Sequence, residues 1–247
     1  MAVPGPQHRG RPHRPALGEA DRRGVGVLLD PLDLTLCPLP LQIAGVHSHP
    51  LPDLPHGTLD LAELERLITR GLGSPYHPVC ELICLENTHS SSGGRVLPIE
   101  YLRQVHLLAR THGVRVHLDG ARLMNAAVAL RVPPACIAQH CDSVSLCFSK
   151  GLGAPVGALV GGPKHFIEEA WRLRKALGGG MRQAGVLAAA ALVGLADAEE
   201  VLLRDHQNAQ KFAKGAWTPP LPFGPRGYIL IPNAQHVCIL PAGEGKA

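Results

Sequence analysis

Residues 142–157, DSVSLCFSKGLGAPVG, decide the fold of this chain. The first seven alternate apolar with small polar side chains, which predicts a buried β-strand ending near Phe148. A glycine-rich loop follows the strand and carries Lys150. Ligands of open α/β sheets bind at the carboxyl ends of strands, and glycines let them approach the backbone. Lys150 is therefore a candidate for Schiff-base formation, and the alternative is a solvated loop lysine.

A second stretch, residues 115–122, RVHLDGAR, predicts another strand that ends at Asp119, before Gly120 and a helix that starts at Ala121. Asp119 then reaches the same sheet edge as Lys150. A carboxylate there can pair with a protonated pyridine nitrogen while a lysine holds the aldehyde, as in pyridoxal phosphate sites. The alternative role for Asp119 is a helix N-cap. Together the two stretches indicate a candidate cofactor site.

The elements before Asp119 follow a βαβα order. Thr58 to Glu63 offers a capping box for a helix that Gly71 ends, and residues 81–86 predict a strand. Pro98 begins the next helix, which Gly113 ends. The expected apolar faces of these two helices are Leu61, Leu64, Leu67 and Ile68, and Ile99, Leu102, Val105 and Leu108. The order predicts an α/β fold with a mainly parallel sheet flanked by helices, and Glu86, Asp119 and Lys150 near its carboxyl edge.

The elements after Lys150 are a short strand over 156–161 and a helix that begins at Pro163 with Phe166, Ile167, Ala170 and Trp171 on its apolar face. The sequence GGGMRQ, residues 178–183, interrupts the helical pattern. A long alanine-rich helix then continues towards His206 or Lys214. Its apolar part, residues 186–195, is too short to span a membrane and predicts a buried helix.

The two ends differ from the middle in composition. Residues 1–24 are rich in Pro, Arg, Gly and His, which predicts disorder. We therefore expect three segments: 1–40, a disordered N-terminus; 41–215, an α/β domain; and 216–247, a proline-rich tail.

Composition excludes several classes of protein. The formal net charge of +4 is too small to indicate a nucleic-acid partner, and no apolar run is long enough for a membrane span. Seven cysteines without a disulfide framework indicate reduced thiols and a cytoplasmic protein. Neither the cluster Cys80, Cys84 and His89 nor the cluster Cys136, His140 and Cys141 has the paired CxxC spacing of a zinc site, so we expect no metal.

Four motifs resemble the low-specificity L-threonine aldolases: LENTHSSSGGRVLP, VHLDGARLMNA, CDSVSLCFSKGLGAPVGALVGG and RKALGGGMRQAGVLAAA. The similarity runs over residues 41–215. It implies the large-domain sheet of the pyridoxal-phosphate-dependent enzymes of fold type I, the aspartate-aminotransferase-like fold, in an incomplete member with unrelated ends. It also implies a lyase that cleaves L-threonine or L-allo-threonine to glycine and acetaldehyde.

The resemblance implies a role for each of five residues. Lys150 would bond to the cofactor aldehyde, Asp119 would hold the ring nitrogen, and Arg122 would bind the substrate carboxylate. Arg182 would bind the cofactor phosphate across a subunit interface, and His77 would lie near the substrate hydroxyl as a base. The alternatives are a surface salt bridge for Arg122 and an exposed loop histidine for His77. Asn87 and His89 would form the floor of the site.

The resemblance also implies partners. An amino-acid substrate and a homo-oligomer, or an assembly with a complete family subunit, are expected. The family's phosphate-binding turn and C-terminal domain have no counterpart in this sequence. The alternative to an active lyase is therefore a degenerate, inactive homologue that has at most a binding role.

Overall fold

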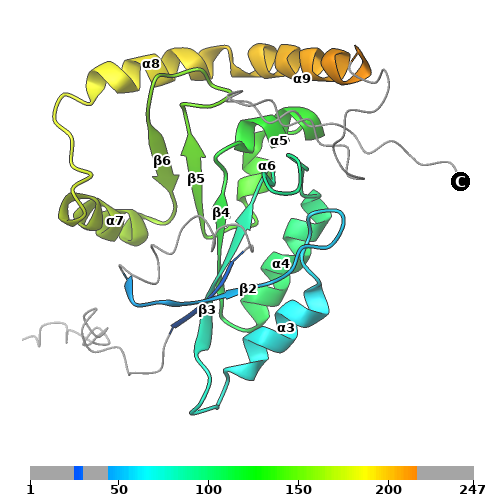
Figure 1. The fold of residues 1–247 in the computed structure, drawn as a ribbon. Helices are drawn as coiled ribbons and strands as arrows, with labels where there is room; N and C mark the ends of the chain where they lie inside the picture. The colour runs from blue at the N-terminus through cyan, green and yellow to red at the C-terminus, as the bar shows by residue number, and fades with distance from the viewer. Residues whose placement is uncertain (1–24, 30–43, 216–247) are drawn as a thin grey trace, which may run out of the picture.

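The computed structural model describes residues 25–29 and 44–215, which form a six-stranded sheet with helices packed on it (Figure 1). The sheet order is β2-β1-β3-β4-β5-β6. The strands are β1 (Val25–Leu29), β2 (His47–Pro50), β3 (Val79–Glu86), β4 (Arg115–Asp119), β5 (Ser143–Cys147) and β6 (Ala158–Gly161). Neighbouring strands from β2 to β5 pair in parallel, and β6 pairs antiparallel with β5 at the edge. The predicted mainly parallel sheet is confirmed.

The helices are α3 (Leu61–Arg70), α4 (Ile99–Thr111), α5 (Leu123–Leu130), α6 (Pro134–Ala138), α7 (Lys164–Ala176), α8 (Gly185–Ala196) and α9 (Ala198–Gly215). The first four lie on one side of the sheet, while α8 and α9 run across its end (Figure 1). The main core lies between the sheet and α3 to α6. It includes Leu64, Ile83, Val105, Leu118 and Ile137, all fully buried.

The boundaries of α3 and α4 follow their sequence signals. The Asp60 carboxylate caps α3 by accepting hydrogen bonds from the backbone N–H groups of Ala62 and Glu63. The predicted reciprocal capping box does not form, because the Glu63 side chain pairs with Arg66 instead. Pro98 precedes α4, and Gly113, with φ +71°, reverses the chain after it.

The buried face of α4 lies slightly round the helix from the predicted one. Leu102 and Val105 are buried as expected, but Tyr101 and Ala109 complete the buried set. Ile99 and Leu108 are only partly buried. The hydroxyl of the buried Tyr101 accepts a hydrogen bond from the Leu59 backbone N–H at 2.9 Å. This polar partner satisfies the hydroxyl at a position that apolar periodicity alone does not predict to be buried.

Five of the residues predicted to be disordered, within the segment 1–40, instead form strand β1. Val25–Leu29, VGVLL, forms a strand between β2 and β3, in parallel with both. Its apolar and β-branched residues suit an interior strand, but its pairing partners lie more than twenty residues away in the sequence. The remaining residues of 1–40, and the tail 216–247, lie outside the described residues.

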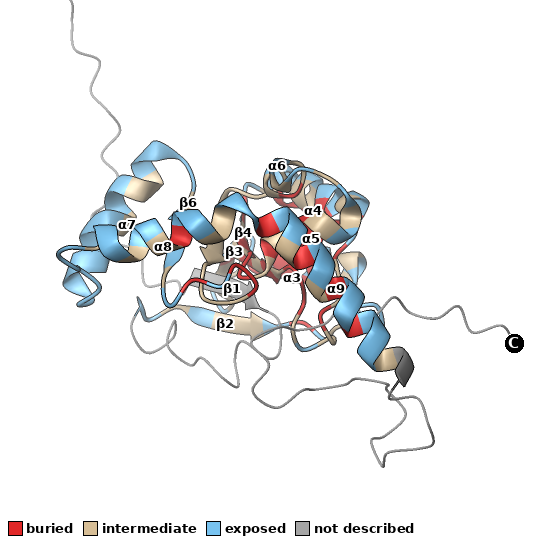
Figure 2. Ribbon diagram, turned by 90° about the horizontal axis from the view of Figure 1, so that it is seen from above, coloured by how far each residue is buried: buried red, intermediate tan, exposed pale blue. Residues whose placement is uncertain are grey.

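The alanine-rich segment forms two helices rather than one, because α8 ends at Ala196, with Asp197 as its C-cap, and α9 begins at Ala198. The prediction that residues 186–195 form a buried helix is wrong. Val186, Leu192 and Val193 are 76%, 67% and 69% exposed, and α8 is largely exposed along its length (Figure 2). A helix that is apolar on all sides carries no periodic signal for the one side that packs. Trp171 of α7 is likewise 68% exposed, against expectation.

Within the part of the chain that the structure describes, every helix is too short or too polar to cross a bilayer.

Candidate functional site

Three neighbouring strands bring a glutamate, an aspartate and a serine to the carboxyl edge of the sheet. Glu86 is the last residue of β3 and pairs in register with Asp119, the last residue of β4. Asp119 in turn pairs with Ser145 of β5. Residues in register on adjacent strands point to the same face of the sheet, so these side chains form one polar row.

Asp119 is held from two sides. Its Oδ1 accepts a hydrogen bond from the backbone N–H of Ala121 at 2.9 Å and another from the Ser145 hydroxyl at 3.2 Å. Helix α5 starts only at Leu123, with Arg122 at its N-cap position, so Asp119 closes the turn before the helix rather than capping it. The predicted alternative of an N-cap is therefore wrong. The result is a half-buried carboxylate in a fixed orientation.

Lys150 lies on the loop directly after β5, five residues beyond Ser145. The loop is closed by three backbone hydrogen bonds, from Gly153 N to Lys150 O, from Ala154 N to Phe148 O and from Phe148 N to Gly157 O. Lys150 is half-buried, and its amino group forms no hydrogen bond or ion pair with any described residue. It follows that a primary amine without a protein partner stands at the same edge as Asp119.

Arg122 follows Asp119 by one turn and lies against Glu86. Its Nη1 is 3.5 Å from Glu86 Oε1, and its side chain is only 15% exposed. Arg122 Nε is buried without a hydrogen-bond partner among the described residues. Burial raises the pKa of Glu86, although the Ser90 backbone N–H that donates to its Oε2 opposes this shift. Arg122 is therefore a buried cation with unused donor capacity, and not the surface salt bridge that was the alternative.

Next to Glu86 lies His89, which the sequence analysis named in the rejected zinc cluster and as part of the site floor. Its ring is 3% exposed, with Nε2 at 3.1 Å from Asp53 Oδ2 and Nδ1 at 3.6 Å from Glu86 Oε2. Asn87 is fully buried and accepts a hydrogen bond from the Leu97 backbone N–H at 3.2 Å. Both residues are buried beside Glu86, and their role as the floor of the site stays a prediction. Asp53 carried no recognisable signal, because it reaches His89 from a loop far earlier in the chain.

The structure does not bring His77 to this edge. His77 precedes Val79, the first residue of β3, whereas the polar row lies at the other end of this strand, at Glu86. A strand of eight residues spans about 26 Å at about 3.3 Å per residue, so His77 is far from Asp119 within one chain. His77 was expected near the substrate because it is close in sequence to Glu86. That closeness does not take into account that β3 separates the two residues along its whole length.

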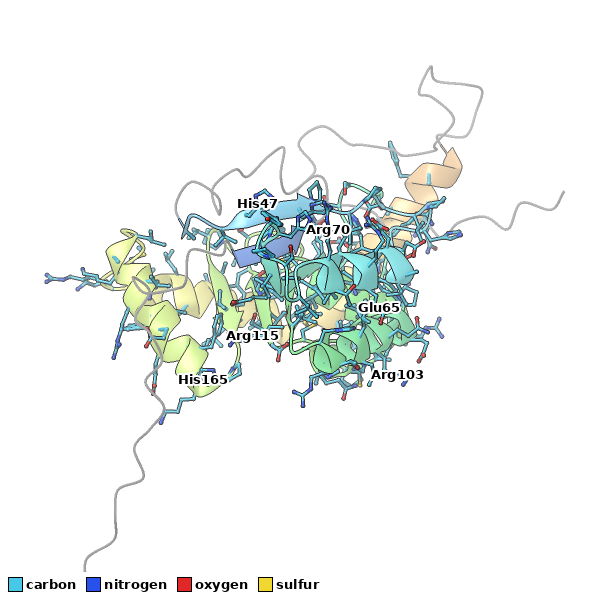
Figure 3. All side chains as sticks on the ribbon, turned by 90° about the horizontal axis from the view of Figure 1, so that it is seen from below. His47, Glu65, Arg70, Arg103, Arg115 and His165 are labelled. Carbon is cyan, nitrogen blue, oxygen red and sulfur yellow. The ribbon has the colours of Figure 1, made fainter. Side chains whose placement is uncertain are left out.

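His77 instead lines a cavity of about 270 Å³ at the amino edge, together with His47, His49, Leu67, Arg70, Gly71, Pro78 and Cys80. Arg70 Nε donates to His77 Nε2 at 3.4 Å. Figure 3, which views the molecule from below, shows His47 and Arg70 close together there. This cavity lies at the amino edge of the sheet, opposite the carboxyl edge that carries the polar row of Glu86, Asp119 and Ser145.

Arg182 is exposed on the loop between α7 and α8. It forms no hydrogen bond or ion pair within the described part of the chain, and nothing in its own chain ties it to Asp119 or Lys150. The predicted role of Arg182 across a subunit interface stays a prediction.

The residues at the carboxyl edge suit pyridoxal phosphate. Asp119 supplies an oriented anion for a pyridinium nitrogen, Lys150 supplies an unpaired amine for an aldehyde, and Arg122 supplies orphaned donors for a carboxylate. Within residues 25–29 and 44–215, no group of three His, Cys, Asp or Glu side chains is placed to bind a metal ion.

Comparison with known proteins agrees with this geometry. Residues 37–226 match the family model described as beta-eliminating lyase. Low-specificity L-threonine aldolase 1 of Arabidopsis thaliana is 50% identical over 173 residues, covering 70% of this chain and 48% of the plant protein. Low specificity L-threonine aldolase of Escherichia coli is 40% identical over 172 residues, covering 70% of this chain and 50% of the bacterial one.

Among solved structures, a threonine aldolase of Leishmania major superposes with a TM-score of 0.63 at 20% identity, covering 81% of this chain and 58% of that one. This likeness confirms the fold predicted from the sequence. The chain spans about half the length of the curated relatives it matches.

Proposed function

Because the chain belongs to the beta-eliminating lyase family, we propose that it is a pyridoxal-phosphate-dependent lyase of the threonine aldolase type. Its reaction is cleavage of L-threonine or L-allo-threonine into glycine and acetaldehyde. The observation that carries the proposal is the pairing of an oriented Asp119 carboxylate with an unpartnered Lys150 amine at one sheet edge. The 40–50% identity to L-threonine aldolases supports the choice of substrate.

Each residue at the edge has one role in this proposal. Lys150 holds the aldehyde carbon of the cofactor, and Asp119 keeps the ring nitrogen protonated. Pyridoxal phosphate, when bound, withdraws electrons from the substrate carbon that carries the amino group. Arg122 binds the substrate carboxylate with the donors that Glu86 leaves free, because a guanidinium matches a carboxylate in two-point geometry.

Cleavage between Cα and Cβ also needs a base for the proton of the β-hydroxyl. The sequence assigned this proton to His77. His77 lies at the opposite edge of the sheet from Asp119 and Lys150 of its own chain. It would therefore have to act on the site of a second copy of the chain. This is one reason to propose a homo-oligomer, or an assembly with a complete family subunit, as the active form; Arg182, exposed and unpaired, would then meet the cofactor phosphate of the neighbouring site.

A cytoplasmic location for this amino-acid lyase is the last part of the proposal. It is supported by the cysteines, because Cys80, Cys136, Cys141 and Cys147 form no disulfide within the described part of the chain.

The experiment that tests the function is turnover of L-threonine. The purified 247-residue chain with added pyridoxal phosphate should release acetaldehyde from L-threonine, and coupling to alcohol dehydrogenase lets the release be followed as loss of NADH. Lys150→Ala should abolish release, whereas Lys164→Ala, which removes an amine that is 91% exposed on α7, should not change it. No release above the Lys150→Ala background, in a folded protein that binds cofactor, would favour the inactive alternative.

A further inference from the structure

The loop that carries Lys150 packs closely against helix α9. Leu152 and Ala154 are 6% and 7% exposed, and Leu152 packs with Ala198 and Leu202 of α9 in a small second core. Figure 1 shows α8 and α9 running end to end over this edge of the sheet. The loop is therefore buried on its outer side although α8 itself is exposed.

Two glycines make this contact possible. A Cβ at Gly194 of α8 would overlap the carbonyl oxygen of Leu152. A Cβ at Gly151 would lie 2.6 Å from Leu202 Cδ2 and 3.2 Å from Asn125 Oδ1. Real Cβ atoms essentially never approach other heavy atoms below 3.0 Å, so a side chain at Gly194 would displace the backbone of the loop or of the helix. A side chain at Gly151 would first displace the end of the Leu202 side chain.

A buried polar pair links α9 to α5, the helix that follows the Asp119 strand. Asn125 of α5 and His206 of α9 are 7% and 9% exposed, and Asn125 Nδ2 lies 3.2 Å from His206 Nε2. Burial lowers the pKa of His206, so at neutral pH its ring is uncharged and Nε2 accepts the amide hydrogen. This bond ties α9 to the helix that begins just after Asp119 and Arg122.

We propose that Gly194 and the Asn125–His206 pair are positioning residues for Lys150, which set the loop at a fixed distance from Asp119. Gly194 sets how closely α8 approaches the Leu152 carbonyl, and His206 holds α9 to α5, so α8 and α9 together press the Lys150 loop onto the sheet. The inference rests on the proposed function only for what Lys150 binds. The buried residues of this second core, Leu152, Ala198 and Leu202, are distinct from those of the main cluster between the sheet and α3 to α6, although Leu146 packs against both.

The consequence for chemistry is geometric. In the proposed function, Lys150 and Asp119 contact opposite ends of the cofactor ring. A shift of the loop changes the distance between the two side chains, so that both can no longer contact the ring at once. A misplacement of about 1 Å can cost about a hundredfold in rate. The residues that prevent such a shift determine activity without contacting the cofactor.

The test compares two alanine substitutions in one helix of the full chain. Gly194→Ala places a methyl group on the Leu152 carbonyl, whereas Gly185→Ala, also in α8, adds a methyl group with nothing within 4 Å. Both changes favour the helix, by about 1 kcal/mol inside it and by less at Gly185, its first residue, so a loosened loop in Gly194→Ala alone has to come from the contact with Leu152. Two readouts need no cofactor: amide hydrogen exchange of residues 150–154, and the rate at which acetic anhydride labels Lys150 relative to Lys164, read by peptide mass spectrometry.

We expect Gly194→Ala to speed exchange in the loop by about tenfold or more and to change the labelling ratio, with Gly185→Ala unchanged. A third readout, the dissociation constant for pyridoxal phosphate, should rise by about tenfold to a hundredfold in Gly194→Ala alone. Equal exchange and labelling in the two variants would overturn the inference. If the unchanged chain bound no cofactor, the proposed function would fail, and the two cofactor-free readouts would still decide this inference.

A second pair of variants decides the matter if Gly194→Ala does not fold. His206→Leu removes the acceptor of the Asn125 amide, and His206→Gln restores an acceptor of similar reach. Loop exchange and Lys150 labelling should change in the leucine variant and return towards the parent in the glutamine variant. If His206→Leu leaves both measurements at the parent values, His206 does not position the loop.

Discussion

The Asp119 carboxylate contributes both to stability and, in the proposed function, to cofactor binding. Substitutions that remove its hydrogen bonds or only its charge should separate these two contributions. Its Oδ1 accepts hydrogen bonds from the Ala121 backbone N–H at 2.9 Å and from the Ser145 hydroxyl at 3.2 Å, which is a duty in folding. Its negative charge faces the proposed ring nitrogen, which is a duty in binding. Asp119→Asn keeps an oxygen acceptor and removes the charge, whereas Asp119→Ala removes both.

The magnitudes follow from these contacts. Hydrogen bonds to a charged acceptor contribute about 1.5–3 kcal/mol each, and the half-buried setting favours the low end, so Asp119→Ala should lower the free energy of unfolding by about 2 kcal/mol. Asp119→Asn should lower it by less than about 1 kcal/mol, because a neutral oxygen still accepts both bonds. Loss of the charge-assisted bond to the ring should weaken cofactor binding by about 10- to 150-fold in both variants.

Asp142 is the matched control. It is also half-buried and accepts a backbone N–H, from Val116 to its Oδ2 at 2.8 Å, but it precedes β5 and so lies at the opposite edge. Urea unfolding and a cofactor titration, on all variants, give the two quantities. Asp142→Ala should lose stability and keep its affinity. Unchanged affinity in Asp119→Asn, or equal loss of affinity in Asp142→Ala, would refute the reasoning.

Three other predictions follow from the packing and from the pKa shifts. Gly120→Ala should lower the free energy of unfolding by about 1–3 kcal/mol in urea melts, since its Cβ would lie 2.6 Å from the Ser145 carbonyl oxygen; a change below about 0.3 kcal/mol would contradict this packing. Because burial holds the pKa of His206 below 6.5, its contribution to stability is present above that pH and is lost as the pH falls through the lowered pKa. Between about pH 7.5 and pH 5.5 the parent should therefore lose more stability than His206→Gln, and equal losses would show that His206 does not titrate in this way. Burial raises the pKa of Cys80 to about 11 and that of Cys141 to about 12, so iodoacetamide at about pH 8 should label both only after denaturation; rapid labelling of the folded protein would contradict their burial.

The sheet edge was predictable because its signals are local. Asp119 and Lys150 each follow a short apolar run directly, and the end of a parallel strand reaches the same edge whatever the rest of the chain does. Glu86 was placed by the same argument. The order of strands was less accessible, since β1 inserts between β2 and β3 through pairing that no local pattern encodes.

The errors have a common physical source, which is that contacts between distant segments override local pattern. Residues 186–195 are apolar enough to be buried, yet α8 crosses the end of the sheet and packs mainly through small residues, Ala191 and Gly194. His206 reaches Asn125 across 81 residues, and nothing near either residue in the sequence indicates the other. His77 was misplaced because a motif gives spacing along the chain and not the edge of the sheet to which it leads.

The most direct test of the account is the absorbance of pyridoxal phosphate mixed with the purified chain. The account predicts a saturable long-wavelength band, above the absorbance of free cofactor, that Lys150→Ala abolishes while Lys164→Ala leaves it intact. Thermal unfolding of the three proteins, measured alongside, shows that each is folded. A band of equal size in Lys150→Ala, or no band in the folded parent at about millimolar cofactor, where even weak sites fill, would contradict the assignment of Lys150 as the residue that holds the cofactor.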